Sequence, residues 1–209
     1  MERRNLFCCG LACTGKSRIV EKMSSIYDIT TVYADFNELC TLHSKFKTKH
    51  QDPVIQILYT IKQTMDSSKA SNSIFDRSPI SDLCYELIHE ELKTEGLGVL
   101  KLQHLLNWKL FKTICEEFKT LYILIEDDDY EAEKDILAKM VERDNKIDIL
   151  TANYVKAQRK IFKMITKEIS NYHALVKPKE MKIHTQMYYN WLENEVAAFI
   201  IENGYVQKN

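Results

Sequence analysis

The chain alternates short apolar runs, rich in β-branched and aromatic residues, with longer segments in which apolar residues recur every three or four positions. The short runs predict buried strands, because such side chains fit a pleated sheet. The expected strands are Asn5–Cys9, Ile29–Phe36, Ser73–Phe75, Thr120–Ile125 and Met181–Thr185. The helical spacing predicts helices that begin at Lys16 and Pro53 and that span Ile80–Leu92, Leu97–Phe118, Tyr130–Val141, Ile147–Ile169 and Tyr188–Asn203.

Strands that alternate with helices favour right-handed crossovers and a parallel sheet covered on both faces. We therefore expect an α/β fold: a three-layer sandwich of about five parallel strands with helices on both faces. The length of 209 residues fits a single domain over residues 1–209.

Composition narrows the class of protein. With 45% hydrophobic and 10% aromatic residues, the chain can bury a core, which excludes a disordered protein. The balance of 29 basic against 30 acidic residues argues against a nucleic-acid partner held by a large basic surface. No apolar run approaches the roughly 20 residues of a membrane span, and the first residues do not resemble a signal peptide. We expect a cytoplasmic protein with no membrane partner.

The six cysteines contain no C-x-x-C pair, and the six histidines show no ligand spacing. Structural zinc sites need ligands paired at short spacing, so no structural metal is expected. The cysteines are interpreted as reduced thiols, several of them in the core.

The strongest motif is a complete G-x-x-x-x-G-K-S, formed by Gly10, Leu11, Ala12, Cys13, Thr14, Gly15, Lys16 and Ser17. It follows a predicted strand and precedes a predicted helix, which is the context of a phosphate-binding loop. Its backbone N–H groups and the helix N-terminus attract phosphate, the lysine adds a cation, and the serine hydroxyl is suited to Mg²⁺. The alternative is a chance match in a glycine-containing turn.

Two carboxylates follow predicted strands, where ligands gather in a parallel sheet. Asp35 at the second strand could accept a proton from an attacking hydroxyl, or it could merely cap a loop. Asp76 and Arg77 at the third strand suit a metal ion and a phosphate, respectively. Here the alternative is a helix N-cap beside a solvated arginine.

Two weaker candidates lie on helices. Gln56 offers donors and an acceptor that could match a nucleobase edge, although a glutamine on such a helix is usually a surface residue. Lys139, Arg143 and Lys146 could close over a transferring phosphoryl group, or they could belong to a solvated charged hairpin.

Taken together, these motifs resemble the deoxynucleoside kinase and viral thymidine kinase family, to which thymidylate kinases are close structural relatives. Phe75–Asp82 (FDRSPISD) is similar to the family's Glu/Asp-Arg-Ser-x-x-Ser-Asp signature. Ile55–Ile61 resembles the helix whose glutamine pairs with the base, and Lys139–Asp148 resembles the lid. Asp35 stands where the family usually carries a glutamate.

The resemblance implies an ATP- and Mg²⁺-dependent kinase that phosphorylates the 5′-hydroxyl of a pyrimidine deoxynucleoside, with thymidine first among the candidates. It implies that Lys16, Asp35, Arg77 and Arg143 are catalytic, and that Ser17 and Asp76 hold the metal. The implied nucleoside contacts are Asp35, Gln56, Asp76, Arg77 and Asp148. A homodimer is expected from the family.

Two other functions stay open. Asp76, Arg77, Ser81 and Tyr85 also fit the thymidylate kinase frame Asp-Arg-Tyr-x-x-Ser-x-x-Ala-Tyr, which implies a monophosphate acceptor. A lid with few arginines, together with aspartate in place of glutamate, fits a nucleotide-binding protein without catalysis.

Overall fold

The computed structural model describes residues 5–33, 41, 53–70, 72–143 and 149–205. Within these residues one sheet of five parallel strands is found, in the order β2-β3-β1-β4-β5. The strands are β1 (Asn5–Gly10), β2 (Thr30–Tyr33), β3 (Ser73–Asp76), β4 (Thr120–Leu124) and β5 (Tyr172–Val176). The predicted α/β sandwich is confirmed.

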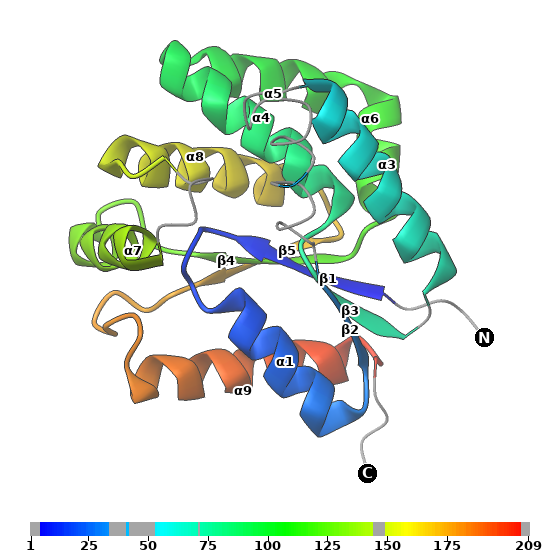
Figure 1. Cartoon of the computed structure of the whole chain (residues 1–209), viewed down its shortest axis with the longest axis vertical. Helices are drawn as coiled ribbons and strands as arrows, with labels where there is room; N and C mark the ends of the chain where they lie inside the picture. Colours follow the sequence, from blue (N-terminus) through cyan, green and yellow to red (C-terminus); the bar gives the residue numbers. More distant parts are fainter. Residues whose placement is uncertain (1–4, 34–40, 42–52, 71, 144–148, 206–209) are drawn as a thin grey trace.

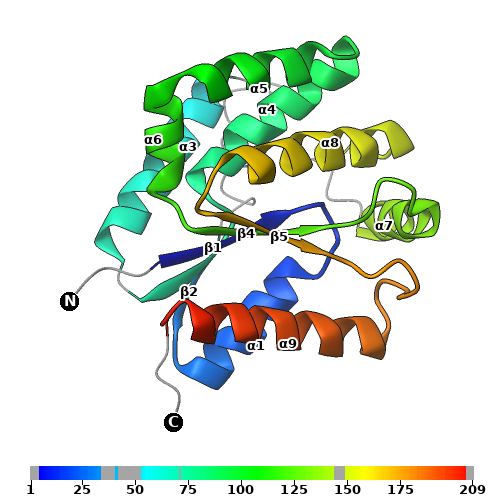
Figure 2. The ribbon, with the colours of Figure 1, turned by 180° about the vertical axis from the view of Figure 1, so that it is seen from behind.

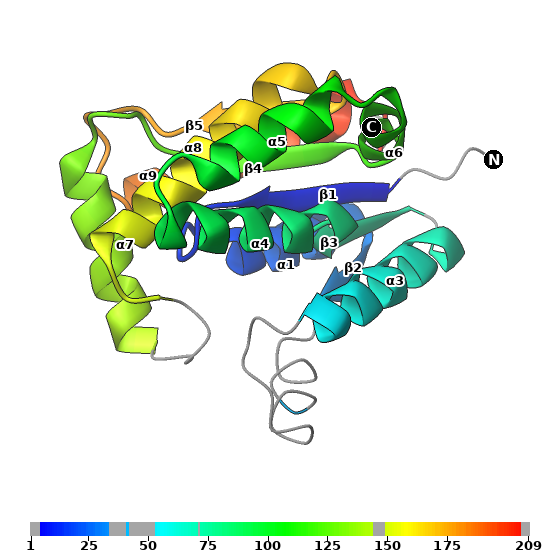
Figure 3. The same cartoon turned by 90° about the horizontal axis from the view of Figure 1, so that it is seen from above.

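Helices cover both faces of this sheet (Figures 1 and 2). On one face lie α1 (Lys16–Tyr27) and α9 (Gln186–Glu202). The other face carries α3 (Pro53–Lys69), α4 (Pro79–Lys93), α5 (Leu97–Asn107), α6 (Lys109–Glu116) and α8 (Ala152–Glu168). Seen from above, α7 (Tyr130–Arg143) stands beyond one end of the strands (Figure 3). None of the described helices has the length and apolar character needed to cross a membrane.

The central strands owe their position to their apolar residues. All five residues of β4 are buried, as are Leu6–Gly10 of β1, because helices pack on both sides of them. The edge strand β2 is partly exposed throughout, and β5 buries only Tyr172 and Leu175. The phosphate-loop motif thus follows a strand that is held on both sides, by β3 and β4.

The predicted last strand was wrong. β5 spans Tyr172–Val176, whereas Met181–Thr185 lies in the connection to α9. The apolar signal of that connection comes largely from Ile183, which is 2% exposed and packs into the core without joining the sheet. β5 itself is an edge strand with exposed residues, so its pattern is weak.

Two predicted helices have different bounds. The expected helix Leu97–Phe118 is interrupted at Trp108, which has an extended backbone (φ −89°, ψ 112°) and separates α5 from α6. The helix expected from Ile147 begins at Ala152, because Thr151 is its N-cap and accepts a hydrogen bond from the Tyr154 N–H.

The predicted lid, residues 139–148, is described only in part. Its first residues form the end of α7, up to Arg143, and residues 144–148 lie outside the described residues. The strand predicted over Ile29–Phe36 is seen as β2, and residues 34–36 also lie outside the described part.

Candidate active site

The motif residues form a tight loop between β1 and α1. Gly10 has φ +116°, and a Cβ there would lie 2.3 Å from the Ile123 carbonyl oxygen of the neighbouring strand. Gly15 has φ +83°, and its Cβ would approach the ring of Tyr189 to 2.9 Å. Both positions therefore need glycine, for backbone conformation and for space. The geometry fits the predicted phosphate-binding loop.

Lys16 is 6% exposed and lies inside this loop. Its Nζ donates a 2.5 Å hydrogen bond to the Leu11 carbonyl oxygen, which also accepts a 2.9 Å bond from the Thr14 hydroxyl. Burial lowers the pKa of Lys16, and the Arg77 guanidinium lowers it further, while Asp76 acts in the opposite direction. An anion bound at this point would restore the electrostatic support of the ammonium group.

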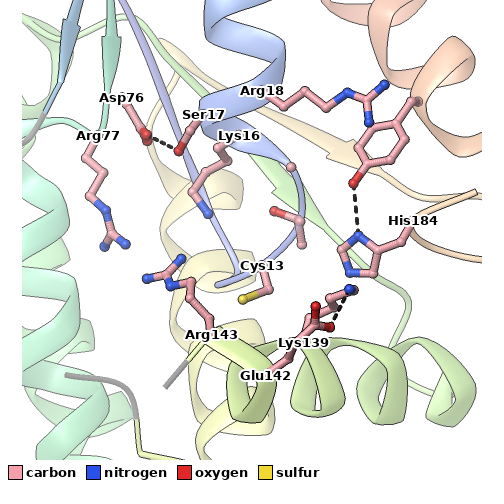
Figure 4. A pocket seen from close by; sticks show the side chains of 13 residues that line it. Cys13, Lys16, Ser17, Arg18, Asp76, Arg77, Lys139, Glu142, Arg143 and His184 are labelled. Carbon is pink, nitrogen blue, oxygen red and sulfur yellow. Dashed lines mark hydrogen bonds and ion pairs between the residues drawn. The ribbon is translucent and has the colours of Figure 1, made fainter. Parts of the chain in front are cut away.

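Ser17 and Asp76 meet because α1, which carries Ser17, follows β1, and Asp76 ends the neighbouring strand β3. Cys8 of β1 is in register with Asp76 of β3, so the carboxylate lies beside the start of α1. The Ser17 hydroxyl donates a 2.5 Å hydrogen bond to Asp76 Oδ2 (Figure 4). A hydroxyl and one carboxylate, completed by phosphate and water oxygens, are the ligands that Mg²⁺ prefers at nucleotide sites. The two residues fit the predicted metal site.

Arg77 has an unusual backbone for a non-glycine residue, with φ +92°. The conformation is held by its N–H, which donates to the Cys8 carbonyl oxygen at 2.9 Å. The side chain is 8% exposed, and its guanidinium lies 4.7 Å from the centre of the Tyr85 ring. A strained backbone fixed by its surroundings often marks a functional position.

The residues after Arg77 anchor it to the core. Ser78 is the N-cap of α4 and forms a capping box with Ser81. The Ser78 N–H lies 3.2 Å from Cys9 Sγ, and Cys9 Sγ lies 3.0 Å from Ser81 Oγ. The N-cap alternative is thus correct for Ser78, and it does not conflict with a site role for Asp76 and Arg77.

A cavity of about 470 Å³ opens over the loop (Figure 4). Arg143, at the end of α7, lines it opposite the loop, as do Lys139 and Glu142, which form a 2.5 Å ion pair. Among the described residues that line the cavity, five are cationic and two are carboxylates; the cations are Lys16, Arg18, Arg77, Lys139 and Arg143. The cavity therefore suits a polyanion such as a triphosphate.

Three lining residues were not predicted from the sequence. Arg18 stacks on the Tyr189 ring at 3.8 Å, and the Tyr189 hydroxyl lies 3.1 Å from His184 Nδ1. Arg18 and His184 lie at the end of the cavity away from Asp76 and Arg77 (Figure 4). His184 and Tyr189 are far from the motif in sequence and belong to no recognisable pattern. Arg18 directly follows the motif, and this adjacency was the one sequence feature that could have pointed to it.

Asp82 is a further residue that the sequence did not single out on its own. It is 6% exposed on α4, and its Oδ2 accepts a 3.2 Å hydrogen bond from the Thr60 hydroxyl of α3. Burial raises its pKa to about 7, against the opposing influence of Arg77 and of the Thr60 bond. Asp82 thus connects the wall of the site to α3.

The structure brings together Lys16, Ser17, Asp76, Arg77 and Arg143 around one cavity. Three predicted candidates, Asp35, Lys146 and Asp148, lie outside the described residues. Gln56 lies on α3, but its side chain is outside the described part of the chain. Within the described residues, no group of three or more His, Cys, Asp or Glu side chains forms a further metal site.

No protein-family model matches the chain, and no curated protein matches it. Solved structures do match over nearly its whole length. Deoxyadenosine kinase from M. mycoides with bound dATP has a TM-score of 0.61 at 16% identity, covering 92% of this chain and 98% of that chain. The same enzyme with bound dCTP has a TM-score of 0.60 at 15% identity, covering 93% of this chain and all (100%) of that chain. The chain thus has the α/β P-loop kinase fold that these deoxyadenosine kinases adopt.

Proposed function

We propose that the protein is an ATP-dependent kinase that phosphorylates the 5′-hydroxyl of a deoxynucleoside. The observation that carries this proposal is the contact between Ser17 and Asp76 beside the buried Lys16, in a cavity whose other walls carry Arg77 and Arg143. A metal site, a loop cation and two guanidinium groups around one space are the parts that phosphoryl transfer needs.

The triphosphate of ATP would bind at the loop, with Lys16 near its terminal phosphates. Ser17 and Asp76 would hold Mg²⁺, which neutralises developing charge on the phosphates. The donor nucleoside would then lie toward Arg18 and His184, which are at the opposite end of the cavity from Asp76 and Arg77, where we place the acceptor (Figure 4). In this direction the reacting phosphate would lie between Arg77 and Arg143, two of the three arginines among the described residues that line the cavity.

At the acceptor end we assign roles from the family resemblance. Asp35 would accept the proton of the attacking hydroxyl, and Gln56 would bind the base, with Asp148 as a further nucleoside contact. Arg77 would bind the transferring phosphoryl group together with Arg143. We propose a pyrimidine deoxynucleoside, thymidine first, as the substrate. The solved neighbours hold dATP and dCTP, so deoxyadenosine and deoxycytidine belong in the same test.

Replacing the loop cation should abolish turnover. We expect Lys16→Met to lower kcat by about 10²-fold or more with every accepted nucleoside, because charge on the transferring group loses its buried partner. The measurement is a coupled assay with thymidine, deoxycytidine and deoxyadenosine. The matched control is Lys22→Met, since Lys22 is an exposed residue of α1. Full activity in Lys16→Met would contradict the proposal.

The general base is tested separately. Asp35→Asn keeps the size of the side chain and should lower kcat by about 10²-fold or more, the usual contribution of a positioned base. Asp28→Asn is the control, because asparagine tolerates the left-handed backbone of this helix C-cap. Unchanged turnover in Asp35→Asn would remove Asp35 from the mechanism and leave the nucleotide site intact.

A monophosphate acceptor is the second candidate. The stacking of Arg77 on Tyr85 joins two residues of the thymidylate kinase frame, which is the observation that favours it. Assaying thymidine beside thymidine monophosphate separates the two kinases. A protein that binds Mg²⁺-ATP but phosphorylates no acceptor in this panel would be a nucleotide-binding protein without catalysis.

A further inference from the structure

Two buried side chains from opposite faces of the sheet hold the phosphate loop. Gln158 of α8 accepts a 2.9 Å hydrogen bond from the Ala12 N–H through its Oε1. Tyr188 of α9 donates a 2.8 Å bond to the Thr14 carbonyl oxygen. Both side chains are 0% exposed, and α8 and α9 lie on opposite sides of β1 (Figure 1). Neither residue lies in a motif, and neither lines the cavity.

The bond from Gln158 fixes one peptide plane. The Ala12 N–H and the Leu11 carbonyl belong to the same planar trans peptide, so they point in opposite directions. Because Gln158 holds the N–H toward α8, the Leu11 carbonyl is directed into the loop. There it accepts the bonds from Lys16 and from the Thr14 hydroxyl. Gln158 therefore sets the position of the loop cation without touching it.

The part of α8 that carries Gln158 is tied to α7. Its neighbour Arg159, 8% exposed, forms a close ion pair with Glu133 of α7 and donates to the Glu126 carbonyl oxygen at 3.2 Å. Adjacent residues of a helix point in different directions, so α8 contacts the phosphate loop through one residue and α7 through the next. The Arg159–Glu133 ion pair thus ties the backbone next to Gln158 to the helix that carries Arg143.

The bond from Tyr188 fixes a second peptide plane. It holds the Thr14 carbonyl toward α9, so the Gly15 N–H of the same peptide points the opposite way, toward the cavity that Gly15 lines. Burial raises the pKa of Tyr188, which keeps the hydroxyl protonated as a donor. Tyr188 thus orients a backbone N–H that a phosphate oxygen can use.

We propose that Gln158 and Tyr188 are positioning residues that preorganise the phosphate loop for a triphosphate. One fixes the carbonyl that places Lys16, and the other fixes an N–H donor. A loop already in its binding conformation loses less conformational freedom when the ligand arrives. The inference rests on the proposed nucleotide site, but it concerns binding of phosphate groups and does not require turnover.

The test uses Gln158→Met and Tyr188→Phe, which remove the hydrogen-bonding atoms and keep side-chain size close to the original. The matched control is Tyr205→Phe, because the buried Tyr205 hydroxyl donates in the same way to the Asn5 carbonyl, at the far end of β1. Calorimetric titration with Mg²⁺-ATP and with inorganic triphosphate measures binding. We expect Kd for both probes to rise about fivefold to tenfold in each test variant, the loss usual for one hydrogen bond, and to stay unchanged in Tyr205→Phe.

Thermal unfolding of each variant separates positioning from stability. A variant that keeps the Tm of Tyr205→Phe but binds triphosphate more weakly supports the inference, as does a KM for ATP that rises while the KM for the nucleoside stays constant. Unchanged Kd in both Gln158→Met and Tyr188→Phe overturns it, and so does an equal loss in Tyr205→Phe.

The proposed function fails in a different way. If the wild-type protein phosphorylates no nucleoside while the two variants still weaken triphosphate binding, the inference stands and the kinase assignment falls. If the wild-type protein is an active nucleoside kinase and both variants bind as it does, only the inference falls.

Discussion

At the scale of single residues, the cavity concentrates positive charge that the chain as a whole does not carry. The protein has a formal net charge of -1, yet cationic side chains outnumber carboxylates among the described residues that line the cavity. Lys16 and Arg77 are both less than a tenth exposed; burial lowers the pKa of Lys16, and the Arg77 guanidinium lowers it further. Such an arrangement is costly in the empty protein and favourable once an anion binds.

Asp82 predicts a pH dependence of stability. Its folded pKa of about 7 lies above the ordinary aspartate value of 3.8, so the folded state binds the proton more tightly than the unfolded state. Stability that depends on this proton is therefore full below about pH 4 and is lost as the pH rises through about 7. Asp82→Asn stays neutral at every pH. We expect it to exceed the wild-type free energy of unfolding by on the order of 2 kcal/mol at pH 8.

Urea unfolding at pH 4, 6 and 8 measures this difference. Near pH 4 the difference should be small, because Asp82 is then protonated in the folded state and partly protonated in the unfolded state. The control is Asp66→Asn on α3, whose side chain is 42% exposed and should give a nearly constant difference across the range. If the difference in free energy of unfolding between Asp82→Asn and wild type does not grow with pH, the raised pKa of Asp82 is contradicted.

At the scale of elements, the sequence predicts best where the signal is local. β1, β3 and β4 were located correctly because each centres on a short apolar run, and the loop between β1 and α1 was identified because its residues are contiguous. β5 was missed because this edge strand buries only Tyr172 and Leu175, and the buried Ile183 gave the connection to α9 a strand-like apolar signal. The break at Trp108 left no mark on the leucine periodicity.

The same distinction applies to the site. Lys16, Ser17, Asp76 and Arg77 belong to two short motifs that parallel pairing of β1 with β3 brings together. Gln158, His184, Tyr188 and Tyr189 come from the last third of the chain and reach the loop only through tertiary packing. Their contacts depend on how α8 and α9 lie on the sheet, which periodicity alone does not determine.

The N-cap of α8, Thr151, should contribute to the stability of the protein. Its hydroxyl oxygen accepts a 3.2 Å hydrogen bond from the Tyr154 N–H at the beginning of α8. Thr151→Ala should lower the free energy of unfolding by about 1 kcal/mol, because an N-terminal N–H of the helix loses its partner. The control is Thr113→Ala at an exposed position within α6, where alanine should be neutral or slightly stabilising. Equal stabilities of the two variants in urea unfolding would argue against the cap.

At the scale of the whole molecule, the family resemblance predicts a homodimer. Trp108, Leu110 and Ile114 on and beside α6 are 56%, 51% and 43% exposed, and they form the candidate surface within the predicted helix Leu97–Phe118. Light scattering coupled to size-exclusion chromatography should give twice the mass of the 24.6 kDa chain. Ile114→Lys should shift the protein toward the monomer if α6 is buried in the dimer, whereas Lys112→Ala should not. A wild-type monomer at micromolar concentration would contradict the prediction.

The strand order has a consequence for how the molecule assembles. β1 lies in the middle of the sheet, but its partners β3 and β4 begin only at Ser73 and Thr120. Pairings between segments so distant in sequence require large loops to close, which slows folding. A chain that ends before Thr120 would expose one edge of β1. The helices α8 and α9, whose side chains contact the loop, come later still in the sequence. The phosphate-loop motif therefore depends for its support on segments that come much later in the sequence than its own residues.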